Sequence, residues 1–442
     1  MHRPSNLTRP RLAAVLVTAA ALALTGCTST GSPGDANTPQ SVSTNVTDKP
    51  VTLTLAYVDD PPTEALVAAF TDKYPNVTIK TQLTPFADYV KSIQRSMASD
   101  SAPDIAEYNP GAMRTLIPAG LVLNLDQYKK AYGWDKSFPP SGLEVLSSDK
   151  DAKQYATGSL YAVPGGMSVF GIFYNKSLLK QAGITDLPET LSDFEDDMQQ
   201  AQTAGITPLS LGALQVGAYQ TWSALVNVLG DPQNYRDWVY GKPGSTIVTD
   251  GAEQATATIE DWVKKGYIPK GASAIADSDA LANFVNGKAL FLITGNWAAA
   301  AMEKGMGDNV GFFPFPATSA GSAKVAAGAS VAYSISSKTK YPDVAAAFLN
   351  FMSSPEAAKI QFEGGFMPVN TKADLSAQGL NGEIAKGFAE VIDGEGIVPF
   401  PGFASPGMPA KLASGVQGLV TGQMKGDDFL KSLQTEWTDY HG

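Results

Sequence analysis

The sequence has very little cysteine and histidine, and this scarcity excludes several kinds of chemistry. Its 442 residues include one cysteine, Cys27, and two histidines, His2 and His441. A disulfide within the chain is impossible, so stability must come from packing. Neither a Ser-His-Asp or Cys-His catalytic arrangement nor a histidine-rich zinc site can be assembled from these residues. We therefore expect a protein that is not an enzyme, with no cofactor, no metal ion and no catalytic residue.

Nucleotide-binding loops and excess positive charge are lacking too. The Gly-Lys pairs at 241–242 and 287–288 are followed by Pro243 and Ala289, not by Ser or Thr, so neither is a Walker A loop. The formal net charge is −11, and it becomes −14 without residues 1–26, which hold three arginines and no acid. An acidic surface argues against nucleic acid as a partner and against a polybasic membrane patch.

The first residues have the pattern of an export signal. Three arginines precede an apolar stretch over 12–24, which is too short to span a bilayer. Leu24-Thr25-Gly26-Cys27 resembles the bacterial lipobox, whose cysteine is diacylated and begins the mature protein. We predict a signal peptide over 1–26, lipidation of Cys27, and attachment to the extracytoplasmic face of the cell membrane. A plain secretory peptide with an incidental cysteine is the alternative.

After the signal, a spacer leads into an alternation of strand and helix patterns. Residues 28–50 are mostly Ser, Thr, Gly, Pro, Asn and Asp, which predicts a lipid-anchored flexible spacer over 27–50. Apolar residues have period two over 51–57 and again over 77–83, and helical spacing follows each stretch. This order predicts an α/β body with a mostly parallel sheet. A second α/β stretch begins at 160 and is interrupted by Pro164-Gly165-Gly166.

Motifs in this body resemble those of one protein family. The segments 158–164 (GSLYAVP), 173–176 (FYNK) and 178–184 (LLKQAGI) resemble the crossover region of extracellular solute-binding proteins. The closest group is the carbohydrate-binding family 1 of ATP-binding-cassette (ABC) importers. Further segments resemble the same family in the same order: 102–106, 119–125, 284–289, 295–297, 348–352 and 354–356.

The resemblance implies a two-lobed periplasmic-binding-protein fold of type II, with a ligand cleft between the lobes and hinge crossings. We expect these crossings near Val163–Gly166, Phe313–Pro316 and Met352–Glu356. Lobe 1 would combine 51–163 with 314–355, and lobe 2 would combine 164–313 with 356–442. The implied activity is capture of a mono- or oligosaccharide by a monomer, which delivers it to ABC permease subunits in the membrane.

Two other functions stay open at this point. The same fold could hold a non-sugar solute, such as a peptide, a polyamine or a chelate. A secreted glycan hydrolase would need two acids about 5–10 Å apart in the cleft. The sequence does not reveal that geometry.

The strongest ligand candidates surround a predicted strand-to-helix turn, because ligands of open α/β sheets bind beyond the carboxyl ends of strands. Trp297 follows a strand expected at 289–293, and the family places a ligand-stacking tryptophan at this motif. A helix-start residue packed in the core is the alternative. Asn296 is expected either to cap the helix or to bond the ligand.

Other candidates follow other strands. Asp59 and Asp60 come after the first strand, where the family often has a sugar-binding acid, although helix capping explains them equally well. Gly328 and Ser330 resemble the family's small-residue turn. The complete set of predicted ligand-binding residues is Trp297, Asn296, Gly295, Asp59, Asp60, Tyr57, Glu107, Asn109, Trp222, Gly328, Ser330 and Phe366.

Overall fold

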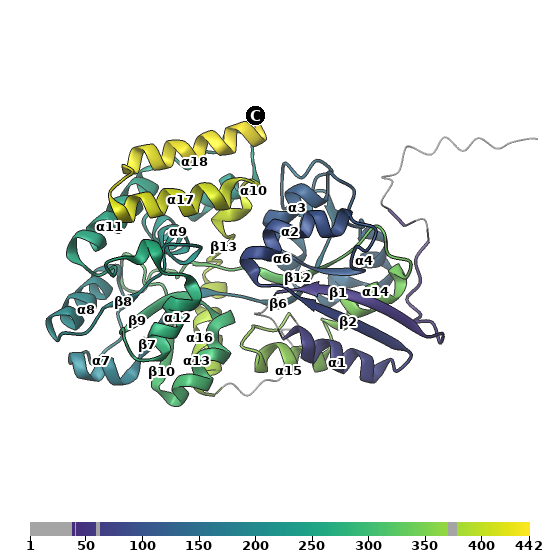
Figure 1. Cartoon of the computed structure of the whole chain (residues 1–442), viewed down its shortest axis with the longest axis horizontal. Helices are drawn as coiled ribbons and strands as arrows, with labels where there is room; N and C mark the ends of the chain where they lie inside the picture. Colours follow the sequence, from purple (N-terminus) through teal and green to yellow (C-terminus); the bar gives the residue numbers. More distant parts are fainter. Residues whose placement is uncertain (1–37, 40, 59–61, 370–377) are drawn as a thin grey trace, which may run out of the picture. The chain divides into compact units, whose positions relative to one another are not determined.

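The computed structural model describes residues 38–39, 41–58, 62–369 and 378–442, and all structural statements concern these residues. Their strands form two larger sheets, each covered by helices, and two short strand pairs (Figure 1). We call the first larger sheet with its helices the first lobe, and the second larger sheet with its helices the second lobe.

The first sheet has the strand order β2-β1-β3-β12-β6 and mixes parallel with antiparallel pairs. β1 pairs in parallel with β2 and β3, as the strand-helix alternation predicts. β12 pairs antiparallel with β3 and β6, so the expectation of a mostly parallel sheet is wrong at this edge. β6 leads to the second sheet and β12 returns from it, so neither belongs to a helical crossover that would make it parallel. The strands are β1 Val51–Tyr57, β2 Val77–Leu83, β3 Ile105–Tyr108, β6 Val163–Met167 and β12 Ser330–Ile335.

The helices of the first lobe join distant parts of the chain. α1 buries Leu66 and Phe70, and the Phe70 ring packs edge-on against Phe348 of α14 with ring centroids 5.3 Å apart. This contact explains the helical spacing of apolar residues after β1. The remaining elements are α1 Thr63–Lys73, α2 Phe86–Ala98, α3 Pro110–Leu116, α4 Asp126–Tyr132, α5 Trp134–Ser137, α6 Pro140–Glu144, the pair β4 Ser147–Ser148 and β5 Ser159–Leu160, α14 Pro342–Phe351 and α15 Pro355–Glu363.

The second sheet has the order β10-β7-β9-β8. α9 packs against both this sheet and α11, and ten consecutive residues of α9 are buried, so it is a core helix. α17 and α18 lie side by side (Figure 1). The elements are β7 Phe170–Asn175, α7 Lys176–Ala182, α8 Leu191–Thr203, β8 Leu209–Ser210, α9 Gly217–Leu229, α10 Pro232–Tyr240, α11 Asp250–Lys265, η1 Ala272–Ala274, α12 Asp277–Val285, β9 Phe291–Gly295, η2 Asn296–Ala298, α13 Ala299–Met306, η3 Gly307–Asn309, β10 Val310–Pro314, β11 Ala326–Ala327, α16 Gly379–Asp393, β13 Ile397–Val398, η4 Pro401–Phe403, α17 Met408–Thr421 and α18 Gly426–His441.

The chain passes between the lobes at three places. The first lies between β6 and β7, and the second lies between β10 and β12. α15 packs against α1 and β6 of the first lobe, so we place the third crossing between α15 and α16. This position is later than the expected Met352–Glu356. The exact lobe boundaries stay a prediction.

Pro164-Gly165-Gly166 lies inside β6, and the interruption predicted at these residues comes after that strand, before β7 begins at Phe170. A Cβ atom on Gly165 would lie 2.3 Å from the ring of Tyr333 on the neighbouring strand β12. The glycine is therefore required for a close approach between strands.

Part of the expected flexible spacer packs on the first lobe. Val42 and Val46 are partly buried against the core. The main-chain N–H of Ser43 donates to Asp343 Oδ1 at 3.0 Å, and Asn76 Nδ2 donates to the Lys49 carbonyl at 3.1 Å. The expectation of a free spacer up to residue 50 is therefore wrong for residues 41–50.

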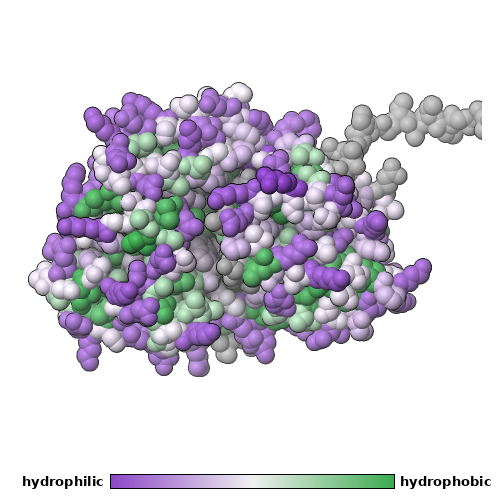
Figure 2. All heavy atoms as spheres, in the orientation of Figure 1, coloured by the Kyte–Doolittle hydropathy of each residue, from purple (hydrophilic) through white to green (hydrophobic). Residues whose placement is uncertain are grey.

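The surface of the described residues is mainly polar. On the face in Figure 2, apolar side chains form small separate groups among polar ones. Within the described ranges, no helix has the length and apolar character needed to cross a membrane.

The carboxyl group of Asp197 on α8 is partly buried and poorly solvated. Its Oδ2 atom is buried and has no hydrogen-bond partner among the described residues. Burial, together with the nearby charges of Asp193 and Asp196, raises the pKa of Asp197 to about 7. A carboxyl group whose folded pKa exceeds its unfolded value favours folding below the unfolded pKa, and this contribution is lost as the pH rises through about 7.

We predict that Asp197→Asn stabilises the protein at pH 8, because it removes a poorly solvated charge. The free energy of unfolding should rise by about 1–2 kcal/mol after allowance for partial solvent screening, and by clearly less at pH 5. Urea unfolding at both pH values measures the difference. As a control, Thr190→Ala breaks the capping box at the start of α8 without removing a charge near Asp197, and it should lower stability at both pH values. Identical stability of the Asp197→Asn variant and the original protein at pH 8 would contradict the prediction.

Candidate functional site

Asn296, at the start of η2, holds two inter-lobe segments together. Its side chain is fully buried. The Val169 N–H donates to Asn296 Oδ1 at 2.8 Å, and Asn296 Nδ2 donates to the Gly365 carbonyl at 2.7 Å. Val169 lies in the first crossing, and Gly365 follows α15. Both polar ends of the carboxamide are therefore used by the main chain, so the side chain neither caps the following helix nor has a free end for a ligand, contrary to both predictions for Asn296.

The same two segments pair directly beside Asn296. Met167 and Met367 exchange main-chain hydrogen bonds of 2.7 and 2.9 Å. The Phe366 side chain, a predicted ligand contact, is 1 % exposed and lies beside Gly166, where a Cβ would be 3.2 Å from the Phe366 Cβ. Phe366 thus packs on the crossing.

The predicted small-residue turn also lies against the first crossing. A Cβ on Gly328 would lie 2.8 Å from the Ser168 carbonyl oxygen, so only glycine fits there. The Ser168 hydroxyl donates to the Ala329 carbonyl at 2.9 Å. Ser330 begins β12, where its main chain pairs with Met167. These residues shape the hinge region, next to the predicted ligand turn.

Trp297 stands directly after Asn296 and is only partly buried. Its indole ring lies over Gly295, because a Cβ on Gly295 would come 1.9 Å from the ring. The ring centroid is 6.0 Å from Phe400 and 6.4 Å from Phe170. Phe400 in turn packs edge-on against Phe403 at 5.8 Å. We call Trp297, Phe400 and Phe403 the aromatic row.

Three predicted residues lie at the ends of strands in the first lobe. The Tyr57 hydroxyl donates to Glu64 Oε1 at 2.5 Å, and burial together with this bond raises the pKa of Tyr57 to about 12. The Val58 N–H donates to Glu107 Oε2 at 3.0 Å. Asn109 Oδ1 accepts the Gly111 N–H at 2.8 Å and caps α3. Each side chain has a structural partner at the edge where β1 and β3 end.

The two lobes meet at this edge. A Cβ on Gly111 would lie 3.2 Å from the Gly402 carbonyl and 3.6 Å from the Phe403 ring, which places the start of α3 against η4. Tyr108, just before Asn109, is 3 % exposed, and its hydroxyl has no hydrogen-bond partner among the described residues. A buried hydroxyl without a partner is costly, so this hydroxyl is one unsatisfied polar group near the contact between the lobes.

Tyr108 and the aromatic row beyond Trp297 are not among the predicted ligand-binding residues. The signal for the row was the pattern Phe400-Pro401-Gly402-Phe403, which places two aromatic residues around a turn.

Trp222 does not belong to the site. Its side chain is fully buried, its Nε1 donates to Thr256 Oγ1 at 3.0 Å, and its ring packs against Phe429 at 5.0 Å. The ring lies between helices of the second lobe because α9 is buried along most of its length. Asp59, Asp60 and Cys27 lie outside the described residues.

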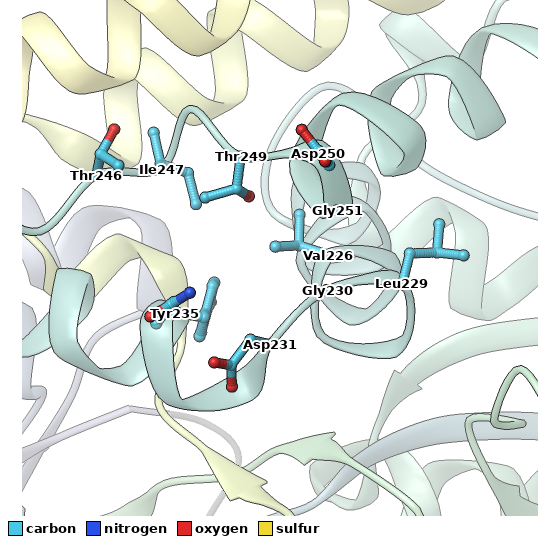
Figure 3. Close-up of a pocket in the computed structure, with 11 residues that line it drawn as sticks. Val226, Leu229, Gly230, Asp231, Tyr235, Thr246, Ile247, Thr249, Asp250 and Gly251 are labelled. Carbon is cyan, nitrogen blue, oxygen red and sulfur yellow. The ribbon is translucent and has the colours of Figure 1, made fainter.

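A separate pocket of about 280 Å³ lies within the second lobe (Figure 3). It is lined by the end of α9, the start of α10 and the residues that lead into α11. Asp231 and Asp250 contribute carboxylates, but Asp231 already caps α10. None of the predicted ligand residues lines this pocket. In the described ranges, no group of three or more His, Cys, Asp or Glu residues is arranged to hold a metal ion.

Comparison with known sequences identifies related proteins. The model of the family "Bacterial extracellular solute-binding protein" matches residues 58–359. The chain is 24 % identical over 313 residues to a multiple sugar-binding protein of Streptococcus mutans serotype c, covering 70 % of this chain and 71 % of the relative. It is 27 % identical over 300 residues to the maltodextrin-binding protein MdxE of Bacillus subtilis strain 168, covering 66 % and 68 %.

Comparison with solved structures identifies the fold. A structure described as a chitin oligosaccharide binding protein superposes with a TM-score of 0.75 at 22 % identity, covering 89 % of this chain and 100 % of the other. The prediction of a two-lobed α/β fold of the type II periplasmic-binding class is confirmed.

We predict that Asn296→Ala destabilises the protein without acting through a ligand. The substitution leaves the Val169 N–H and the Gly365 carbonyl without partners, which should lower the free energy of unfolding by about 2–4 kcal/mol. Urea denaturation of the ligand-free protein measures the loss.

Asn286→Ala is the matched control for this variant. Asn286 Nδ2 donates to the Ala282 carbonyl in its own exposed turn, so its loss should change stability by less than about 0.5 kcal/mol. If both variants kept the original stability while Asn296→Ala lost ligand affinity, the structural role given to Asn296, holding the two inter-lobe segments together, would be wrong.

Proposed function

Because the chain belongs to the family of bacterial extracellular solute-binding proteins, we propose that it captures a carbohydrate and delivers it to the permease of an ABC importer. The observation that carries this proposal is the aromatic row at the contact between the lobes. Trp297, Phe400 and Phe403 lie within 6 Å of one another in succession. Relatives named for sugar or maltodextrin binding support the same ligand class.

The chemistry of the row suits a saccharide. Sugar rings have apolar faces and rims of hydroxyl groups. The partly buried indole of Trp297 offers a flat apolar surface for such a face. The unpartnered Tyr108 hydroxyl, at the end of β3, offers a hydrogen bond to a sugar hydroxyl. Neutral hydroxyl groups also tolerate the acidic character of the chain better than an anionic ligand would.

We propose that binding and closure are the whole activity. A ligand that touches Trp297 from the second lobe and Tyr108 from the first stabilises the state in which the lobes meet. The liganded population then shifts toward that closed state, and no bond is made or broken. The relatives are named as binding proteins, which supports this reading.

We further propose that Cys27 carries lipid and attaches a monomer to the extracytoplasmic face of the membrane. Residues 41–50 pack on the first lobe, so the anchor would lie about 14 residues before the docked segment. A fully extended chain of that length spans no more than about 50 Å. The tether would thus hold the protein within reach of a permease and raise its effective concentration there.

We predict that isothermal titration of the mature protein with a panel of mono- and oligosaccharides detects binding, and that Trp297→Ala weakens it about tenfold to hundredfold. The loss follows from removal of the stacking surface, and Trp297→Phe should lose less. Heat from peptides or polyamines but from no saccharide would overturn the carbohydrate proposal, and appearance of cleaved product would overturn the binding-only proposal.

Trp222→Phe is the matched control for this titration. It removes the Nε1 bond to Thr256 deep in the second lobe, so we expect lower thermal stability with saccharide affinity unchanged. A loss of affinity equal to that of Trp297→Ala would mean that the titration reports general damage to the fold.

We predict that Cys27→Ala moves the protein from the membrane fraction to the soluble extracytoplasmic fraction, because no acyl chains can then be attached. Fractionation with immunodetection measures the shift, and saccharide affinity should be unchanged. Retention of the variant in the membrane fraction would contradict the anchor.

A further inference from the structure

Arg114 on α3 is a buried cation at the contact between the lobes. It is 2 % exposed, and its guanidinium group donates four hydrogen bonds to main-chain carbonyls. Nε donates to Phe403 at 2.6 Å, Nη1 to Ala152 at 2.7 Å and Lys153 at 3.0 Å, and Nη2 to Val239 at 2.8 Å. The planar fork of guanidinium donors allows these four bonds at once, which a lysine ammonium would not.

The four carbonyls come from both lobes. Ala152 and Lys153 lie between β4 and β5, close to α3 in the first lobe. Val239 lies in the last turn of α10, and Phe403 ends η4, both in the second lobe. The carbonyl end of a helix favours a positive charge, so Val239 is a suitable partner for the cation. Arg114 therefore fills the contact between the lobes at this point.

Aromatic rings enclose the guanidinium group. Its Cζ atom lies 4.0 Å from the ring centroid of Tyr155 and 5.6 Å from that of Tyr440 in α18. The Tyr155 hydroxyl donates to the Pro110 carbonyl at the start of α3, and the Tyr155 N–H donates to the Tyr240 carbonyl at 2.9 Å. Tyr155 thus fixes the guanidinium from the side and adds another bond between the lobes.

This cluster stands at one end of the aromatic row. Phe403, the last ring of the row, supplies the carbonyl that accepts from Arg114 Nε. A saccharide that stacks along Trp297 and Phe400 toward Phe403 would meet the buried guanidinium next. To extend further, it would have to separate the guanidinium from the Phe403 and Val239 carbonyls of the second lobe, which leaves donors of a buried charge unpaired.

We propose that Arg114 is a specificity-determining residue that closes one end of the ligand site and so limits the length of the saccharide that binds. The inference rests on the proposed carbohydrate function. Arg114 acts here as a wall, and it need not contact a short ligand.

The test is titration of the original protein and of Arg114→Ala with three series of saccharides. These are α-1,4-glucose, β-1,4-N-acetylglucosamine and β-1,4-xylose oligomers, each from the monosaccharide to the hexasaccharide. In the series that binds, the affinity of the original protein should fall sharply above a short length. Arg114→Ala should bind the longest members at least about tenfold more tightly than the original protein, with the affinity for short members changed much less.

Two further variants separate length selection from damage to the fold. Arg114→Lys keeps the charge but not the four-bond fork, so it should give an intermediate length limit, and it replaces Arg114→Ala if that variant does not fold by circular dichroism. Arg236→Ala is the matched control, because Arg236 Nε also donates to a main-chain carbonyl, that of Ile397, at 3.0 Å. It should leave the length limit unchanged.

The outcomes distinguish the two proposals. If the original protein binds long and short members equally, or if the Arg114 variants keep its length limit, the wall is refuted while carbohydrate binding stands. If no saccharide binds to the original protein or to any variant, the proposed function itself fails, and the length limit fails with it.

Discussion

The hydrogen bonds of one buried carboxamide, that of Asn296, hold together the segments by which the lobes are connected. Chain that leaves one sheet for another takes main-chain N–H and carbonyl groups away from their strand partners, and buried groups of this kind need new partners. Asn296 supplies a donor and an acceptor for Gly365 and Val169. The same turn positions Trp297, because the indole lies over Gly295 immediately before Asn296. The hinge and the proposed stacking surface thus depend on three consecutive residues.

The sequence predicted the positions of helices and strands better than it predicted which of them pair or pack together. The period-two pattern over Val51–Tyr57 and the helical spacing after it correspond to β1 and α1, because local patterning decides which face is buried. The antiparallel return of β12 depends on a segment that comes from the second lobe, which no local pattern reports. Pro164-Gly165-Gly166 was misjudged for the same reason, since the need for Gly165 comes from Tyr333 on a distant strand.

In the candidate site, too, local patterns predicted positions along the chain but not contacts between distant segments. Strand ends could be located from the sequence, so Trp297 follows β9 and Asn109 follows β3 as expected, whereas Glu107 lies within β3. Trp222 follows a strand in the same way, yet α9 is covered on nearly all sides and its tryptophan is buried. Arg114 was not singled out because a lone basic residue on a short helix normally reaches solvent. Only the folded chain brings four carbonyls from separate segments to its guanidinium.

A cation that bonds both lobes raises the question of why it does not hold them permanently closed. When the lobes separate, Arg114 loses the carbonyls of Phe403 and Val239 but regains water, and hydrogen bonds exchanged with water contribute little net free energy. Closing reverses the exchange and also carries the cost of removing the charge from solvent. The two terms oppose each other, so the guanidinium adds little to the balance between open and closed states. Once the lobes have met, the Arg114 guanidinium acts sterically. The ligand on the aromatic row then provides the driving force for closure.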